Sequence, residues 1–225
     1  MAKIKKTVEA QKQRAEEIYA RLFKLYPDVR CTLDRRNPFE LIIATILAAQ
    51  CTDARVNIVT KTLFKKYKKP EDYLKVPIVE LERDIHSCGF YRMKARNIVG
   101  LCRRVIEKHG GKVPGTIKEL LQLPGVGRKT ANVVLGDCFD TQGVVVDTHC
   151  GRLARRMGFT TNEEPKKVEQ DLMKVWPPDR WSLFSHLMVF HGRAVCSSRT
   201  PRCSQCVIAD ICPFPDTSEG RKVAT

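Results

Sequence analysis

Hydrophobic residues recur at helical spacing along almost the whole chain. Two stripes each predict a surface helix with one buried face; they run through Ile18, Tyr19, Leu22, Phe23 and Tyr26, and through Ile58, Val59, Leu63, Phe64 and Tyr67. The segment from Phe39 to Ala49 is apolar nearly all round, which predicts a central helix buried on every side. The only strand-like run, Val144 to Val146, is too short to found a sheet. The pattern therefore predicts an all-α fold of about ten helices.

Proline and glycine follow these stripes where helix ends require them. They stand at Pro27, Pro70, Gly110, Gly111, Gly158, Pro177 and Pro178. No low-complexity tract or linker separates two modules, so we expect helices packed across a cleft rather than domains joined by a flexible segment. The polar residues from Thr217 to Thr225 predict a frayed tail.

The net charge of the chain is strongly positive. Forty Lys and Arg against 25 Asp and Glu give a formal charge of +15, and basic residues are spread from Lys3 to Lys222. This charge is typical of nucleic-acid binding, although a basic protein whose charge only keeps it dispersed has the same composition. Because 43% of the 225 residues are hydrophobic, the chain can bury a core, which excludes disorder as a description of the whole.

No segment of the sequence resembles an export signal or a membrane span. Met1 to Lys6 is basic but leads into the polar run from Glu9 to Glu17, without the apolar stretch of a secretory signal. The longest apolar stretch, Leu41 to Ala49, is about half of the roughly 20 residues that cross a bilayer. We therefore expect a cytoplasmic protein, whose ten cysteines serve metal binding or chemistry rather than disulfides.

A glycine-containing segment lies between two helical runs and reads Leu123-Pro124-Gly125-Val126-Gly127-Arg128-Lys129-Thr130. Two glycines two residues apart allow a tight hairpin whose backbone a ligand can approach closely. The free amides and the positive dipole at the start of the next helix bind phosphate well. A purely structural turn is the alternative, and the basic pair Arg128 and Lys129 favours phosphate binding. The segment is similar to the helix-hairpin-helix motif of DNA-binding proteins.

The segment Val146-Asp147-Thr148-His149 leads into another predicted helix. A carboxylate at this place is by default an N-cap, which accepts hydrogen bonds from the free amides of the first turn. Asp147 is eighteen residues beyond Lys129, with one predicted helix between them. A lysine and a carboxylate could therefore face one cleft.

Four cysteines near the C-terminus have the spacing Cys196-x6-Cys203-x2-Cys206-x5-Cys212. Four thiolates within seventeen residues predict a metal or cluster site, whereas the other six cysteines show no such grouping. Zinc is the competing occupant, although zinc sites usually pair two short Cys-x2-Cys units. His186 and His191 are five residues apart, which is not a usual ligand pair, so we expect ordinary core or capping roles for them.

These motifs, in this order, resemble the helix-hairpin-helix DNA glycosylases, and within them the endonuclease III family. The resemblance runs from about Asn37 to Cys212 and includes the segments 47–53 and 89–95, which are similar to the two segments that these enzymes press into DNA. It implies two all-α lobes beside a DNA-binding cleft, a contiguous domain over 30–143 and a domain made of 1–29 plus 144–225. It also implies a [4Fe–4S] cluster on Cys196, Cys203, Cys206 and Cys212.

The resemblance assigns roles to individual residues. Lys129 falls on the signature lysine and Asp147 on the signature aspartate, so we expect Lys129 to attack the sugar as a neutral amine and Asp147 to transfer protons and stabilise positive charge. Because an ordinary lysine is protonated at neutral pH, we expect burial in the cleft and the adjacent helix N-terminus to favour the neutral form. The expected DNA contacts are Gln50, Phe90, Gly125, Val126, Gly127, Arg128, Thr130, Arg199 and Arg202.

The implied function is that of a bifunctional DNA glycosylase and abasic-site lyase. The implied substrate is double-stranded DNA that contains damaged pyrimidines or abasic sites, bound by a monomer near the nucleoid. Phe90 in the core and Gln50 as a plain helix-end residue are the alternatives for the two inserting positions. A thymine or adenine mismatch glycosylase of the same fold and a non-catalytic DNA-binding module are the alternatives for the whole chain. Adenine-excising relatives carry a catalytic glutamate where this chain has Thr45, and Cys51 departs from the endonuclease III pattern.

Overall fold

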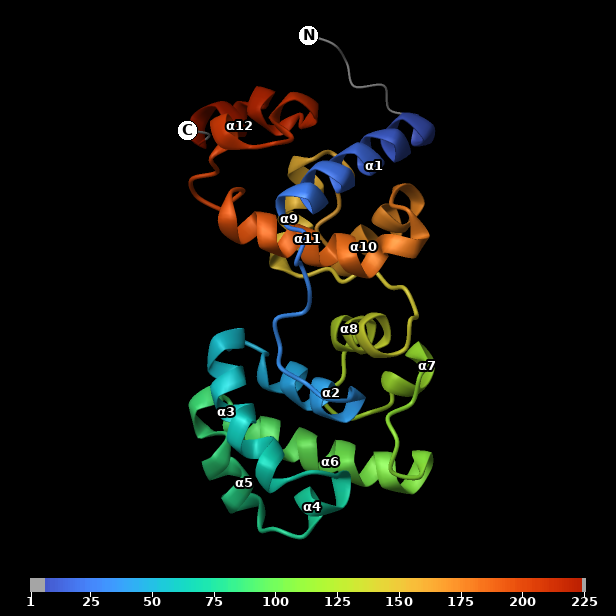
Figure 1. Cartoon of the computed structure of the whole chain (residues 1–225), viewed down its shortest axis with the longest axis vertical. Coiled ribbons are helices and arrows are strands. Elements are labelled where there is room, and N and C mark those ends of the chain that lie inside the picture. The colour runs from blue at the N-terminus through green and yellow to red at the C-terminus, as the bar shows by residue number, and fades with distance from the viewer. Residues whose placement is uncertain (1–6, 224–225) are drawn as a thin grey trace. The chain divides into compact units, whose positions relative to one another are not determined.

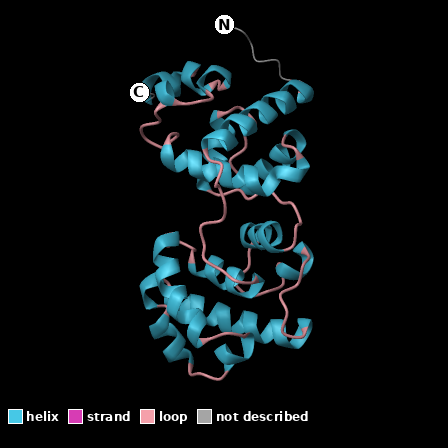
Figure 2. Ribbon diagram, in the orientation of Figure 1, coloured by secondary structure: helices cyan, strands magenta, loops and turns pink. Residues whose placement is uncertain are grey.

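The computed structural model describes residues 7–223, and this range consists of helices and connecting loops without a β-strand (Figure 2). The all-α fold class predicted from the sequence is confirmed. Twelve α-helices lie in the described range: α1 (Val8–Leu25), α2 (Pro38–Leu47), α3 (Asp53–Lys66), α4 (Pro70–Leu74), α5 (Ile78–Asp84), α6 (Tyr91–His109), α7 (Ile117–Leu120), α8 (Arg128–Cys138), α9 (Thr148–Arg156), α10 (Pro165–Val175), α11 (Trp181–Ala194) and α12 (Ser218–Val223). Five 3-10 helices supplement them: η1 (His86–Cys88), η2 (Pro178–Arg180), η3 (Cys203–Gln205), η4 (Ala209–Ile211) and η5 (Phe214–Asp216).

The chain folds into two compact units. The first, here called the hairpin unit, is Cys31–Thr141. The second, here called the cysteine unit, joins the N-terminal segment up to Arg30 with the chain from Gln142 onward. Each unit has its own buried core.

The hairpin unit is built around α2, which packs against α3, α6 and α8 (Figure 1). Asn37 begins this helix by accepting a hydrogen bond from the Glu40 N–H at 2.9 Å, and Pro38 occupies the first turn, where its missing N–H costs nothing. All residues from Phe39 to Leu47 are buried except Thr45, which is half-buried. The expected central helix is therefore present, although it ends at Leu47 rather than at Ala49.

The cysteine unit surrounds a core contributed by α1, α9, α10 and α11 (Figure 1). Trp176 stacks on Phe184 with ring centroids 3.9 Å apart. The run from Val144 to Val146 is extended loop, in which Val144 and Val145 are buried and the Val145 N–H donates to the Ser185 hydroxyl at 2.9 Å. An apolar run of this length is therefore core-filling loop here, as expected of a segment too short to form a sheet.

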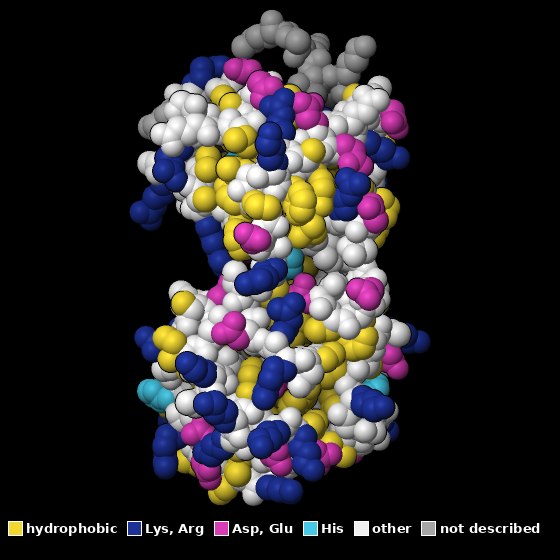
Figure 3. All heavy atoms as spheres, viewed as in Figure 1, with side chains coloured by type: hydrophobic (Ala, Val, Ile, Leu, Met, Phe, Trp, Pro, Cys, Tyr) yellow, Lys and Arg dark blue, Asp and Glu magenta, His cyan; other side chains and the backbone are white. Residues whose placement is uncertain are grey.

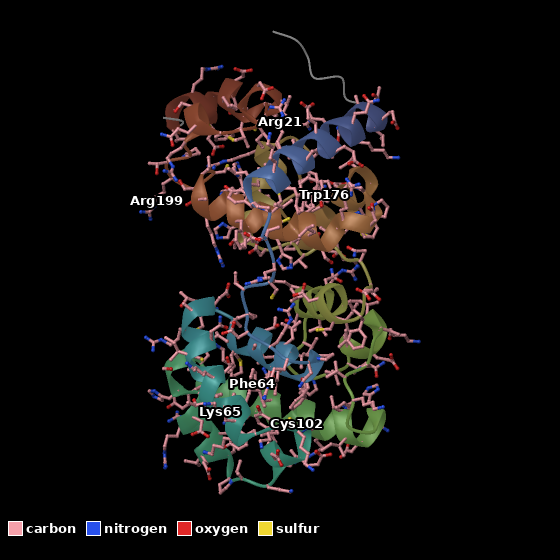
Figure 4. All side chains as sticks on the ribbon, viewed as in Figure 1. Arg21, Phe64, Lys65, Cys102, Trp176 and Arg199 are labelled. Atoms are coloured by element: carbon pink, nitrogen blue, oxygen red, sulfur yellow. The ribbon has the colours of Figure 1, made fainter. Side chains whose placement is uncertain are left out.

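The N-terminal helix anchors the C-terminal segment within the cysteine unit. Arg21 of α1 donates to the Val207 carbonyl at 3.0 Å and to the Asp210 carboxylate at 2.6 Å (Figure 4). Arg14, two turns earlier on the same face of α1, donates to the Met157 carbonyl at 2.6 Å. These contacts join residues more than 140 positions apart in the chain, and those of Arg21 hold the C-terminal segment against α1.

Two expectations from the sequence pattern were wrong. Phe23 and Ile58 are exposed, at 40% and 63%, because each helix buries a narrower face than the stripe suggested. The expected frayed tail contains α12, whose Gly220 N–H donates to the Thr217 hydroxyl at 2.8 Å. Gly220 lies so close to the Phe214 carbonyl that a Cβ would be 1.8 Å from that oxygen, which shows that this end is packed. Residues 1–6 and 224–225, on which the rest of the terminal expectations fall, lie outside the described residues.

Candidate functional site

The predicted helix-hairpin-helix is formed by α7, a turn over residues 121–127, and α8. Gly125 has a φ of +76°, and a Cβ at this position would be 2.8 Å from the Asn97 side chain of α6, so backbone conformation and packing both require glycine. A Cβ on Gly127 would meet nothing within 4 Å. The backbone at Gly127 is therefore open to an external ligand.

The hairpin turn is held from inside by its apolar residues. Leu123 and Val126 are buried, and the Val126 N–H donates to the Leu123 carbonyl at 3.1 Å. Val126 therefore shapes the turn, and the exposed backbone next to it belongs to Gly125 and Gly127. The α8 N-cap is Gly127, which has no side chain to occupy the first amides of the helix. Such a helix start attracts an anion such as a DNA phosphate.

Lys129 is the second residue of α8 and is exposed, as are its neighbours Arg128 and Gly127, while Thr130 is half-buried. The side chain therefore projects from the first turn of a helix whose opposite face, including Ala131 and Val134, is buried. Burial was expected to help keep this amine neutral, but no such burial is present within the hairpin unit.

Asp147 is the N-cap of α9 in the cysteine unit. Its Oδ1 accepts a hydrogen bond from the Cys150 N–H at 2.8 Å, so the N-cap interaction that the sequence indicated is present. The residue is half-buried, and its carboxylate is also next to the half-buried His149. Burial lowers the pKa of His149, whereas the Asp147 carboxylate acts in the opposite direction and raises it. Lys129 belongs to the hairpin unit and Asp147 to the cysteine unit.

Gln50 and Phe90 are both exposed and both have left-handed backbones, with φ of 54° and 46°. Phe90, 58% exposed, is the N-cap of α6, which removes the alternative that it fills the core. Gln50 follows the end of α2 and precedes Thr52, which caps α3. A non-glycine residue in this region of backbone space is strained, and such strain is concentrated at functional sites.

The four spaced cysteines line one pocket in the cysteine unit. Cys196, Cys203, Cys206 and Cys212 are all half-buried, and burial raises the pKa of the Cys212 thiol to about 12. Within residues 7–223, no group of three or more Cys, His, Asp or Glu side chains converges closely enough to hold a metal ion. Four thiols from one short stretch of chain around a shared pocket are the ligand set that an iron–sulfur cluster requires.

Polar groups from helices α9 and α11 surround the cysteine sulfurs. The Arg156 guanidinium lies 3.4 Å from Cys196 Sγ, and His191 Nε2 lies 3.4 Å from Cys206 Sγ. Burial lowers the pKa of His191 to about 4, and its Nδ1 lies 3.3 Å from the Tyr26 hydroxyl. A neutral His191 that accepts from Tyr26 would present Nε2–H to the sulfur, which is how neighbouring groups tune a cluster.

The loop between Cys196 and Cys203 is tied down by arginine. Arg156 donates to the Ser197 carbonyl at 2.6 Å and to the Ser198 carbonyl at 2.8 Å. Arg199 is exposed at the outer edge of its unit (Figure 4). Arg202 is exposed as well, but its guanidinium donates to the Ala194 carbonyl, so part of its hydrogen-bonding capacity serves the fold.

Three residues near these sites were not given their roles by the sequence analysis. His191 was expected to be an ordinary core residue, and Arg156 was not singled out; both are far in sequence from the cysteines that they contact. Lys94 is buried at 2% exposure. Its signal was present in the sequence, because Lys94 stands on the same helical stripe as Ile98, Leu101 and Val105.

Lys and Arg side chains are scattered over the visible face of both units (Figure 3). With a formal charge of +15, this surface suits a polyanion such as DNA. No helix in the described part of the chain is long and apolar enough to span a membrane.

The chain matches two family models. Residues 43–178 match the HhH-GPD superfamily base excision DNA repair protein, and residues 196–212 match the iron–sulfur binding domain of endonuclease III. The second match begins and ends at Cys196 and Cys212. The chain therefore carries the iron–sulfur site of this family, whose cluster is [4Fe–4S].

Individual relatives and solved structures belong to the same family or superfamily. Endonuclease III of Synechocystis sp. is 48% identical over 219 residues, which is 97% of this chain and 100% of the relative. The solved structure of a trapped endonuclease III–DNA covalent intermediate, an estranged-adenine complex, is 48% identical with a TM-score of 0.87, covering 94% of this chain and 97% of that one. A thermostable thymine-DNA glycosylase is 25% identical with a TM-score of 0.80, covering 95% and 99%. The chain belongs to the endonuclease III family of the HhH-GPD superfamily, and it is a base excision repair enzyme with DNA glycosylase and abasic-site lyase activity.

Proposed function

We propose that this enzyme, acting as a monomer, excises oxidised pyrimidines from double-stranded DNA and cleaves the strand through the amine of Lys129. The observation that carries the proposal is the exposed Lys129 in the first turn of α8, beside a glycine turn whose backbone is open. The turn and the start of α8 suit a DNA phosphate. A strand bound there would lie on the same surface as the Lys129 amine.

The amine accounts for both activities. Its nitrogen forms a bond to the sugar C1′ as the bond from C1′ to the damaged base breaks, and the base leaves with a proton given up by the amine. The C1′–O4′ bond then breaks as the C=N bond forms, and O4′ takes up a proton, which opens the sugar ring and gives a protonated Schiff base. Removal of a C2′ proton then expels the 3′ phosphate by β-elimination and cuts the strand. Hydrolysis releases the enzyme for another turnover.

Asp147 is proposed to transfer protons and to stabilise the positive charge that develops on the sugar. Its hydrogen bond to Cys150 fixes the carboxylate at the start of α9, a rigid element, and one oxygen is thereby oriented. A carboxylate next to an amine favours the protonated amine, so Asp147 is not what makes the lysine nucleophilic.

Phe90 and Gln50 are proposed to fill the space that the extruded nucleotide leaves in the duplex. An exposed aromatic ring can unstack bases as an apolar wedge, and a glutamine can form hydrogen bonds to the orphaned partner base. Gly125, Val126, Gly127, Arg128 and Thr130 would hold the phosphate backbone at the hairpin, with Arg199 and Arg202 contacting phosphates from the cysteine unit.

The four cysteines are proposed as the ligands of the cluster in the domain over 1–29 plus 144–225, and the hairpin is proposed to belong to the contiguous domain over 30–143. The cluster would supply a rigid centre that ties down the loop between Cys196 and Cys203. The residues of that loop would then contact DNA. Arg156 holds the loop through hydrogen bonds to two of its carbonyls.

Two related activities are disfavoured. Thr45, which stands where adenine-excising relatives have a catalytic glutamate, has no carboxylate and donates its hydroxyl proton to the Leu41 carbonyl at 2.7 Å. Excision of mismatched thymine is disfavoured by the lower identity to the thymine-DNA glycosylase.

The test is a nicking assay on a duplex with a single thymine glycol, run with borohydride to trap the Schiff base. We expect strand cleavage and a covalent enzyme–DNA adduct that is absent from the Lys129→Ala variant. An adduct formed equally by that variant would refute the role of Lys129, and cleavage only of a G·T mismatch duplex would replace the proposed substrate.

A further inference from the structure

Lys94 is a buried lysine whose ammonium is bound by backbone carbonyls. Its exposure is 2%, and its Nζ donates to the Leu47 carbonyl and to the Cys88 carbonyl, each at 2.8 Å. Lysines are seldom buried so completely, because removing an ammonium from water is costly unless it is well hydrogen-bonded. Burial lowers the pKa of Lys94, as this cost requires.

The two carbonyls belong to the two segments that carry Gln50 and Phe90. Leu47 is the last residue of α2, three residues before Gln50, and Cys88 ends η1, two residues before Phe90. The backbone N–H of Lys94 also donates to the Phe90 carbonyl at 3.0 Å. One residue therefore joins both segments, although they are 40 positions apart in the sequence.

Both segments need such a restraint. Gln50 and Phe90 have φ of 54° and 46°, and Gly89 between Cys88 and Phe90 has φ of 69°. Non-glycine residues stay in this strained region only where surrounding contacts impose it. Hydrogen bonds on the carbonyls that lead into each segment are contacts of that kind.

Packing alone does not require a lysine at this position. The neighbouring buried positions on the same stripe of α6 are Ile98, Leu101 and Val105, and an unbranched apolar side chain such as methionine would fill a similar volume. What lysine adds is a charged donor for two carbonyls, one of them at the negative end of α2. Its burial also keeps the amine away from any sugar, so Lys94 is not a second nucleophile.

We propose that Lys94 is a positioning residue that holds the Gln50 and Phe90 segments in their inserting conformation and so controls base extrusion without touching DNA. This inference rests on the proposed insertion of those two side chains. Lys94 would then act in the extrusion step, which precedes attack by Lys129. That step is needed only when the target nucleotide is stacked in a duplex.

The test compares two substrates with the Lys94→Met holoenzyme. One is a duplex with a central abasic site, which must be unstacked and extruded, and the other is the same abasic strand without its complement. We expect single-turnover strand cleavage of the duplex to fall by roughly ten- to hundredfold, the scale of a small misplacement of a functional group. Cleavage of the single strand should stay within about twofold of wild type, since no stacked base must be displaced.

A second readout follows extrusion directly. A 2-aminopurine placed opposite the abasic site brightens when it is unstacked by an inserting side chain, and we expect this rise to be lost in Lys94→Met. Leu101→Ala is the matched control, because it removes a buried side chain from the same helix, away from both segments. It should lower the melting temperature yet keep the wild-type ratio of duplex to single-strand cleavage. If Lys94→Met does not fold, Lys94→Gln is used in the same comparison.

Each outcome decides the proposal. An equal loss of activity on both substrates, or no loss on either, overturns it. Failure of the wild-type enzyme on a thymine-glycol duplex refutes the proposed lesion class but leaves this comparison valid, because both of its substrates carry abasic sites.

Discussion

Asp147 offers a substitution that separates fold from chemistry. The side chain caps α9 through Oδ1, which accepts the Cys150 N–H at 2.8 Å, and it is also the proposed proton-transfer group. Asparagine keeps an oxygen at the same place and caps helices about as well as aspartate, but it has no charge and does not take up a proton. Asp147→Asn should therefore retain stability and lose the chemistry, whereas Asp147→Ala should lose the chemistry and part of the stability.

The size of each effect follows from the contact. Removing an N-cap costs about 0.5–2 kcal/mol, and for a chain of this length each kcal/mol lowers the melting temperature by roughly 2–4 °C. Asp147→Ala should thus melt about 1–8 °C lower than wild type, and Asp147→Asn within about 1 °C of it. Loss of general acid–base catalysis should lower base release by about 100- to 10,000-fold in both variants.

The assay is single-turnover base release from a thymine-glycol duplex with enzyme in excess, together with thermal unfolding and DNA affinity. Thr217→Ala is the control, since it removes the cap of α12 in the same unit without touching the proposed site. It should lower stability and leave base release unchanged. Unaltered turnover by Asp147→Asn would falsify the catalytic role and leave Asp147 as a cap alone.

Four further predictions follow from other contacts. Lys129→Gln should keep duplex affinity but form no borohydride adduct, and peptide mapping of the wild-type adduct should find the DNA on Lys129; an adduct on Lys94 would contradict the burial argument. Phe90→Ala should slow thymine-glycol release from duplex DNA by at least about tenfold while leaving the melting temperature nearly unchanged, because the ring is 58% exposed; a large loss of stability would return Phe90 to the core. Arg199→Gln should weaken binding to all sequences alike and reduce the salt dependence of affinity by about one phosphate contact, with an unchanged slope counting against that contact. Arg156→Met should make the cluster absorbance near 400 nm bleach faster with an iron chelator, since two loop carbonyls lose their donor; equal bleaching rates would remove Arg156 from cluster support.

Helix positions and the local motifs could be predicted because they depend on short-range chemistry. The run from Phe39 to Leu47 is buried on nearly every side, as its composition indicated. The hairpin was predictable for the same reason, since Gly125 is required by its own φ of +76°. The four cysteines line one pocket, as their spacing within seventeen residues indicated.

Contacts between residues from different parts of the sequence could not be predicted in this way. Arg156 reaches Cys196 over 40 positions, and His191 reaches Cys206 from a different element, so no ligand spacing includes them. The left-handed backbones at Gln50 and Phe90 are also invisible to periodicity, because neither residue favours that conformation. The end of α2 at Leu47 has the same origin, since the apolar run continues while the chain turns away toward Gln50.

Three of the candidate functional side chains stand at helix starts. Lys129 lies in the first turn of α8, Asp147 is the N-cap of α9, and Phe90 is the N-cap of α6. A helix start combines a rigid support with unpaired N–H groups and a positive dipole end, so it holds a side chain at the surface and attracts phosphate to the same place. Side chains on flexible loops would need to be ordered again for each encounter with DNA, at a cost in entropy that a helix start avoids. This placement explains why the enzyme tolerates strain at Phe90, because the ring must project from the beginning of α6 rather than from its buried stripe.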